Sequence, residues 1–222
     1  MTKRQMLLGF AAMSLSLASV MTARANMFSE AQYQVGTATI TIQNWGSANG
    51  TAFITFNSIP NTVFAGLFQI SPPQQSTSYA ACVDLQNYIS FGNSYTYEVW
   101  YANGRAGALA ALFNTINLNN ADEAVGFQLA LWELVYDSYN NPSNDNLFAG
   151  NFIVNSSNPP GAISQAQSFL SQAQGAAPYF YLRAEGGRHQ DLILVPYVPE
   201  PASLLALGVG VAGVALRRRR RA

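Results

Sequence analysis

The sequence predicts an α+β fold in which a small helical layer packs on an antiparallel, sandwich-like β-sheet. Apolar and polar side chains alternate in the first half of the chain, and the pattern changes to a helical one in the second half. The 222 residues include 12% aromatic and only 10% charged side chains. This composition excludes a disordered chain, and the length is enough for one buried core.

The first half contains five candidate strands. The segments 35–43 and 51–56 alternate most clearly, and the turn-forming pair Asn49-Gly50 lies between them. Turn residues also separate the later segments, at Pro72-Pro73 and at Gly92-Asn93. The predicted strands are 35–43, 51–56, 63–70, 79–85 and 95–101.

The second half predicts three helices and a last strand. Asn119-Asn120 can cap the best-defined helix, and Asp122 and Glu123 lie in its first turn, where the helix dipole favours acidic side chains. A polar loop at 140–146 follows, and Gly186-Gly187 predicts a turn before the last strand. The predicted helices are 106–116, 121–136 and 162–173, and the predicted strand is 190–195.

Residues 1–25 form a predicted secretory signal peptide. Lys3 and Arg4 precede an apolar stretch at 6–20, and the small-residue pattern Ala23-Arg24-Ala25 follows it. This order of basic, apolar and small residues is typical of signal peptides, with cleavage expected after Ala25. The alternative is a retained membrane anchor, for which the apolar run is short. Residues 26–198 are then the exported domain.

The C-terminal end has the composition of a second targeting signal. Pro199, Glu200 and Pro201 precede an apolar run at 203–216, and five arginines follow at 217–221. As a helix this run is about 21 Å long, which is short of the roughly 30 Å of a hydrocarbon core. Snorkelling arginines allow a transient inner-membrane anchor with its C-terminus in the cytoplasm.

These three parts, in this order, resemble the PEP-CTERM sorting signal of exopolysaccharide-producing Gram-negative bacteria. The resemblance covers residues 199–222. It implies that an exosortase recognises the tail, cleaves near the motif and delivers the protein to the cell surface or the extracellular matrix. An ordinary single-pass tail anchor is the alternative.

The charge of the exported domain differs from that of the whole chain. The full chain has no formal net charge, but eight of its eleven basic residues lie in the two terminal signals. Residues 26–198 keep three arginines, no lysine and ten carboxylates, a formal charge of −7. This charge excludes nucleic acid and anionic membrane surfaces as partners.

Two residues of this domain are unusual for their positions. Cys82 is the chain's only cysteine, so it cannot form an intramolecular disulfide, and its place in a predicted strand indicates burial. Gln128 lies midway between Ala124 and Trp132, on the core-facing stripe of the predicted helix 121–136. A buried amide needs partners, which are either the backbone of the sheet or Cys82 itself. Attack of the Cys82 thiolate on the Gln128 carboxamide would release ammonia and leave an internal thioester.

The segments around these residues resemble the Cys–Gln thioester domains of bacterial surface proteins. The matching residues are Cys82, Gln128 and Trp132, within the region 79–137. The resemblance implies a covalent adhesion module in which Cys82 carries the acyl group, Gln128 donates it and Trp132 shields it. Such a module acylates surface or matrix nucleophiles once per molecule, so it is not a turnover enzyme. Asp84 shares a strand face with Cys82 and either tunes the thiol or is an exposed carboxylate. These domains are best known from Gram-positive cells, whereas the tail indicates a Gram-negative envelope.

Two other functions stay open on the sequence. One is a non-covalent structural or sugar-binding matrix protein with an inert Cys82, and the tyrosine-rich run 95–101 either stacks on sugars or packs in the sheet. The other is a secreted polysaccharide hydrolase with a carboxylate pair. His189 is the only histidine and is expected in a solvated loop. With one His, one Cys and no phosphate-binding or dinucleotide fingerprint, no metal or cofactor is expected.

Overall fold

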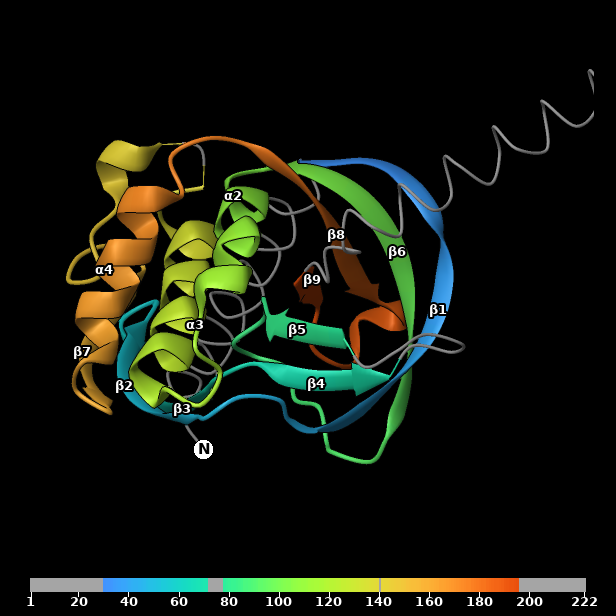
Figure 1. The fold of residues 1–222 in the computed structure, drawn as a ribbon, viewed down its shortest axis with the longest axis horizontal. Helices are drawn as coiled ribbons and strands as arrows, with labels where there is room; N and C mark the ends of the chain where they lie inside the picture. Colours follow the sequence, from blue (N-terminus) through green and yellow to red (C-terminus); the bar gives the residue numbers. More distant parts are fainter. Residues whose placement is uncertain (1–29, 72–77, 140, 196–222) are drawn as a thin grey trace, which may run out of the picture.

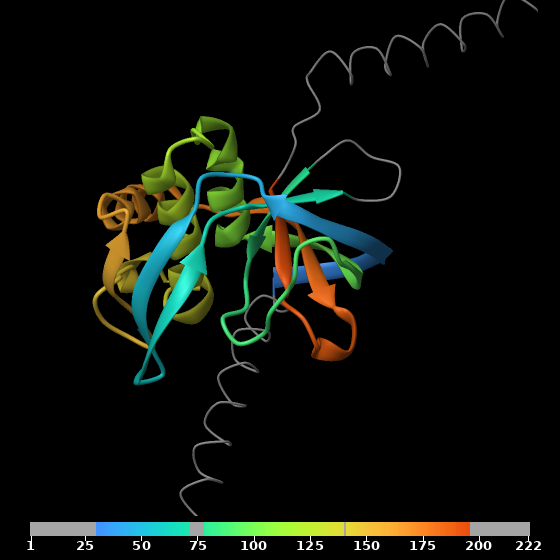
Figure 2. The ribbon, with the colours of Figure 1, turned by 90° about the horizontal axis from the view of Figure 1, so that it is seen from below.

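The computed structural model describes residues 30–71, 78–139 and 141–195. These residues form a closed six-strand barrel and a separate three-stranded sheet, and the α-helices gather on one side of the barrel (Figure 1, Figure 2). The strand order is β1-β4-β5-β9-β8-β6 in the barrel and β3-β2-β7 in the small sheet. The barrel strands are β1 (Ala31–Trp45), β4 (Phe68–Ser71), β5 (Ser78–Cys82), β6 (Ser94–Gly104), β8 (Ala177–Ala184) and β9 (Leu192–Val195). The other strands are β2 (Gly50–Phe56), β3 (Ile59–Ala65) and β7 (Phe152–Asn158), and the α-helices are α2 (Arg105–Ala111), α3 (Ala121–Tyr136) and α4 (Ala162–Gln172).

Strand β1 is long enough to pair with two strands and so to close the barrel. Its residues from Ala31 to Thr41 pair antiparallel with β6, and those from Thr41 to Trp45 pair with β4. Register shifts interrupt both pairings, and β1 bends as an arc around the barrel (Figure 1). Alternate side chains such as Ile40 and Ile42 are buried in the core.

Helix α3 is buried on every side and lies at the centre of the fold. It contacts α2, α4 and strands of both sheets, and every residue from Ala124 to Tyr136 is buried. The side chain of Asn120 caps its start by accepting a hydrogen bond of 3.0 Å from the N–H two residues further on. Gly126 permits close packing against α4, because a Cβ there would lie 2.6 Å from Cβ of Gln165.

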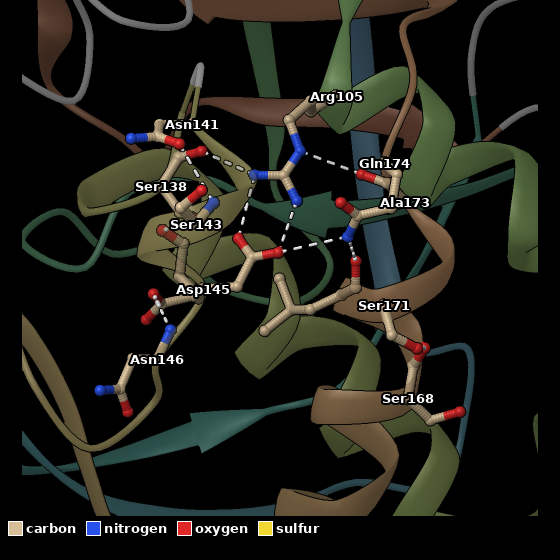
Figure 3. A network of polar contacts seen from close by, with 12 residues as sticks. Arg105, Ser138, Asn141, Ser143, Asp145, Asn146, Ser168, Ser171, Ala173 and Gln174 are labelled. Carbon is tan, nitrogen blue, oxygen red and sulfur yellow. Dashed lines mark hydrogen bonds and ion pairs between the residues drawn. The ribbon is translucent and has the colours of Figure 1, made fainter.

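A buried arginine joins the ends of the helices (Figure 3). Arg105, the first residue of α2, donates to the carbonyl of Ser138 just beyond α3, at 2.7 Å, and to that of Ala173 just beyond α4, at 3.0 Å. Its terminal nitrogens also donate to the two carboxylate oxygens of Asp145, at 3.0 and 2.8 Å. The bidentate ion pair and the two carbonyl groups thus offset the cost of taking the guanidinium out of water.

The prediction of a single sandwich-like sheet is wrong, because six strands close into a barrel and three form a second sheet. The expected strand 63–70 is two strands, β3 and β4, which are separated by a turn where Gly66 has φ +152°. The sequence pattern predicts neither β7 nor β8. Both strands form by pairing with partners far away in the chain, β2 for β7 and β6 for β8.

The other elements agree with the sequence pattern to within a few residues. The helix 121–136 is confirmed with both of its bounds. The helix expected over 106–116 is shorter, because α2 ends at Ala111 and a 3₁₀ turn follows over Leu112–Thr115. Strand β5 ends at Cys82 rather than at residue 85. The segment after Cys82 is not part of a strand, although the N–H of Val83 still donates to the carbonyl of Asp191 at 2.9 Å.

The two terminal signals lie outside the described residues. This applies to the signal peptide 1–25, to Pro199, Glu200 and Pro201, and to the apolar run and arginines that follow them. Within the described ranges, no helix is both long enough and apolar enough to span a bilayer.

Candidate functional site

The structure brings Cys82 and Gln128 together at the junction of barrel and helices. The N–H of Cys82 donates to Oε1 of Gln128 at 3.0 Å, and Nε2 of Gln128 donates to the carbonyl of Cys82 at 2.6 Å. Cys82 pairs with Leu192 of β9 on one side, whereas the pairing of β4 with β5 stops at Ala80. The Gln128 amide therefore replaces a missing strand neighbour, and the buried amide has the sheet backbone as its partner.

The Cys82 thiol is enclosed and protonated. Cys82 is only 3% exposed, and its Sγ donates to the carbonyl of Asp84 at 3.0 Å. Burial raises the pKa of the Cys82 thiol well above its ordinary value, and the negative charge of Asp84 raises it further. A thiol of this kind is unreactive towards solvent, so reaction here requires a partner already held beside it.

Asp84 lies in a turn rather than on an exposed strand. The residue is only 4% exposed, so the alternative of an exposed strand carboxylate is wrong. Its Oδ1 accepts hydrogen bonds from the N–H of Gln86 at 2.8 Å and of Asn87 at 3.3 Å, and its Oδ2 accepts from the Asn87 side chain. Asp84 thus shapes the turn after Cys82 while its charge disfavours the thiolate.

Trp132 lies one turn after Gln128 on α3 and covers the same region. Its indole is 2% exposed and packs edge-on against Phe152, with ring centroids 6.0 Å apart. The indole N–H lies close enough to the sulfur of Cys82 to lower the thiol pKa slightly, against the larger effect of burial. It makes no hydrogen bond of ordinary geometry with any described residue. The indole N–H is therefore a buried donor whose nearest interaction is with the thiol sulfur.

Tyr136 is a site residue that the sequence reasoning missed. Its hydroxyl accepts a hydrogen bond of 3.0 Å from the N–H of Leu85 and donates one of 3.3 Å to the carbonyl of Val83. Tyr136 follows Gln128 by two helical turns, so the same four-residue spacing that singled out Trp132 also identifies it. One face of α3 thus holds the segment after β5 in place.

Glu133, next to Trp132, is a buried carboxyl with an unusual pKa. It is fully buried, its Oε1 accepts from the N–H of Asn146 at 3.0 Å, and its Oε2 has no partner among the described residues. Burial raises its pKa to about 8, and the charges of Asp137 and Asp145 act in the same direction. Glu133 is therefore protonated at neutral pH.

The tyrosine run and the histidine lie elsewhere, in the barrel. Tyr97 is fully buried, so the run 95–101 does not form one exposed face. His189 contacts the rings of Tyr95 and Tyr97, with centroids 4.7 and 4.9 Å away, rather than standing free in solvent. Within the described ranges, no group of three or more His, Cys, Asp or Glu is arranged to hold a metal ion.

A cleft of about 530 Å³ borders the Cys82 site. It shares Asp84, Leu85 and Trp132 with the site, and its other walls come mostly from β3, β4 and the segment after Leu85. A second hollow, of about 520 Å³, is lined by residues around Glu30 and Arg105 and does not include the Cys82 site. Of these two hollows, only the cleft beside Trp132 includes residues of the Cys82 site.

The tail of the chain defines the protein as one that carries a C-terminal export and sorting signal. More particularly, residues 198–220 match the PEP-CTERM protein-sorting motif. This match confirms the resemblance drawn from Pro199, Glu200 and Pro201, and it implies exosortase processing and sorting to the cell surface of a Gram-negative bacterium. No curated protein and no solved structure matches the chain. The resemblance to Cys–Gln thioester domains has no support from these comparisons.

Proposed function

We propose that the exported domain attaches covalently to its surroundings through an internal thioester between Cys82 and Gln128. The observation that carries this proposal is the pair of hydrogen bonds, 3.0 and 2.6 Å long, between the Gln128 carboxamide and the Cys82 backbone. They hold the carboxamide against the residue that bears the thiol, in a place from which water is excluded. Proximity of this kind replaces a rare encounter by an intramolecular step.

Two balanced steps make up the reaction. In the first, Sγ of Cys82 attacks Cδ of Gln128, the bond from Cδ to Nε2 breaks, and the thiol proton leaves with the nitrogen as ammonia. In the second, a hydroxyl or amine attacks Cδ, the bond from Cδ to Sγ breaks, and the nucleophile's proton passes to sulfur. The nucleophile ends as an ester or amide of residue 128. Because the acyl group is consumed, each chain reacts once and the protein is not a turnover enzyme.

The composition of the domain is consistent with a thioester that stays intact until an external nucleophile reaches it. Residues 26–198 contain no lysine, so no lysine amine of the same domain can consume the thioester. Cys82, Gln128 and Trp132 are each 3% exposed or less, which keeps water from the acyl carbon. The sorting signal implies sorting to the cell surface, where the domain would meet nucleophiles of its surroundings.

The test is the intact mass of the mature protein. We expect a mass lower than the sequence mass by one ammonia, and methylamine should add its own mass to the protein and free Cys82 for alkylation. Gln128→Glu keeps the side-chain shape but has no ammonia to lose, so this variant should show its full mass and an alkylatable thiol after unfolding. Gln172→Ala, an exposed glutamine on α4, is the matched control. The full sequence mass, with Cys82 alkylatable in the unfolded wild-type protein, would exclude the thioester.

A non-covalent matrix protein with an inert Cys82 is the second candidate. It is favoured by the completeness of the hydrogen bonding, since the Gln128 amide and the Cys82 thiol both have partners without a covalent bond. The mass measurement separates the two candidates. The polysaccharide hydrolase stays an untested prediction.

A further inference from the structure

The cleft beside Trp132 has aromatic walls and an aromatic mouth. Trp45 stacks on Phe68, with ring centroids 4.8 Å apart, and Phe91 packs edge-on against both. At the mouth, Tyr88 is 79% exposed and Phe64 is 70% exposed. Exposed aromatic side chains gathered around one cleft indicate a binding surface rather than ordinary packing. The volume of about 530 Å³ is typical of small-molecule sites.

The chemistry of the lining favours an uncharged ligand. Asp84 is the single charged residue that lines the cleft, and its carboxylate oxygens accept hydrogen bonds from Gln86 and Asn87. No arginine or lysine lines it, so an anionic polymer would lack a counter-charge there. The remaining polar lining residues are neutral and include Asn61, Thr62 and Gln190.

Two residues that line the cleft each have a buried polar atom that makes no hydrogen bond of ordinary geometry with a described residue. These atoms are a donor, Nε1 of Trp132, and an acceptor, Oε1 of Gln190. The Gln190 amide is oriented by its Nε2, which donates to the carbonyl of Asp84 at 3.2 Å. A hydroxyl can accept from the indole and donate to the amide oxygen, whereas an ammonium group can only donate. This donor and this acceptor therefore match a hydroxyl better than a lysine side chain.

We propose that this cleft binds a neutral sugar unit of a polysaccharide and directs one of its hydroxyls towards Cys82 and Gln128. The apolar faces of the sugar ring lie on the aromatic walls, and the hydroxyl lies between Trp132 and Gln190. The transfer step rests on the proposed thioester: the hydroxyl oxygen attacks Cδ of Gln128, the bond to Sγ breaks, and the proton passes to sulfur. The product is an ester between polysaccharide and protein. Binding itself does not depend on the thioester.

Binding is tested first, in a Cys82→Ala protein that cannot form a thioester. This protein is applied to a panel of immobilised neutral, anionic and aminated oligosaccharides and an apolar peptide. We expect retention on neutral oligosaccharides and about tenfold weaker retention when Tyr88→Ala removes one aromatic contact. Tyr33→Ala, at an exposed tyrosine of β1 that is outside the lining, is the matched control. Retention on the peptide alone would overturn the proposal, and so would a lack of retention on every neutral oligosaccharide. An equal loss of retention in the Tyr88→Ala and Tyr33→Ala variants would also overturn it.

Transfer is tested next, in protein with Cys82 intact. We expect Trp132→Phe, which keeps a ring but lacks the donor, to lower the yield of protein–oligosaccharide ester at least severalfold. The reaction with methylamine, which needs no hydroxyl site, should change less. If the thioester is absent but the Cys82→Ala protein binds neutral sugars, the proposed function fails and the cleft assignment stands. If the thioester forms and no neutral sugar binds or forms an ester, the cleft assignment fails alone.

Discussion

Glu133 is expected to make the stability of the protein fall as the pH rises. The carboxyl is fully buried on α3, with one oxygen bonded to the N–H of Asn146 and the other without a partner among the described residues. Burial raises its pKa from 4.5 to about 8. Glu133→Gln is the informative substitution, because the amide has nearly the shape of the protonated carboxyl but cannot ionise.

The magnitude follows from the two pKa values. Between pH 4.5 and about 8 the folded protein keeps the Glu133 proton and the unfolded chain has lost it, so unfolding releases a proton. The free energy of unfolding then falls with rising pH by up to about 1.4 kcal/mol per pH unit. Over the whole interval the upper limit is about 5 kcal/mol, a large share of the stability of an ordinary domain. Above pH 8 this contribution stays constant.

The assay is urea unfolding of wild type and Glu133→Gln at a series of pH values. The difference between the two proteins is what matters, since other titrating groups such as Glu30, whose pKa burial also raises, cancel in it. We expect the two proteins to be nearly equal near pH 5 and the variant to be more stable by several kcal/mol near pH 9. Exposed Glu185→Gln serves as the control for the loss of a carboxylate. A difference that does not change with pH would refute the reasoning.

Three further predictions concern the buried contacts around α3. Arg105→Ala leaves the Asp145 carboxylate without its bidentate partner and should lower the free energy of unfolding by about 3–5 kcal/mol in a denaturant titration, more than Arg183→Ala at an exposed ion pair. Gly126→Ala brings a Cβ to 2.6 Å from that of Gln165 and should lower the melting temperature; an unchanged or higher melting temperature would show that α4 can move away from α3. Tyr136→Phe leaves the N–H of Leu85 unpaired and should cost about 1–3 kcal/mol and speed amide exchange at that residue; unchanged exchange there would contradict the assigned hydrogen bond.

The sequence predicts local elements here better than their assembly. Helix 121–136 is recognisable because a capping asparagine, two acidic residues and a long apolar run coincide. Strand β7 is not, since only its first three residues are apolar and it is stabilised by pairing with β2 about a hundred residues earlier. Closure of the barrel depends on pairs such as Ala31 with Ala102, which no local periodicity can indicate.

The candidate site, like the fold, is predictable from the sequence in its local features but not in the contacts that depend on the assembled barrel. The four-residue spacing of Ala124, Gln128 and Trp132 is enough to predict that a glutamine is buried beside the sheet. The atoms that it binds depend on where β4 stops pairing with β5, which is a property of the barrel and not of the helix. The raised pKa of Glu133 likewise follows from the burial of α3 on every side, whereas the sequence predicts only one buried stripe.

The position of β9 determines where a force that pulls on the C-terminal end of the chain enters the fold. The strand ends at Val195, three residues before the sorting motif, and it pairs with β5 on one side and β8 on the other. Tension applied to the chain beyond Val195 therefore enters the barrel through β9, where Leu192 lies opposite Cys82. A polymer bound at Gln128 would pull from the other side of Cys82. A load between the chain beyond Val195 and such a polymer would then cross β9, β5 and α3, with Cys82 and Gln128 at the junction of strand and helix.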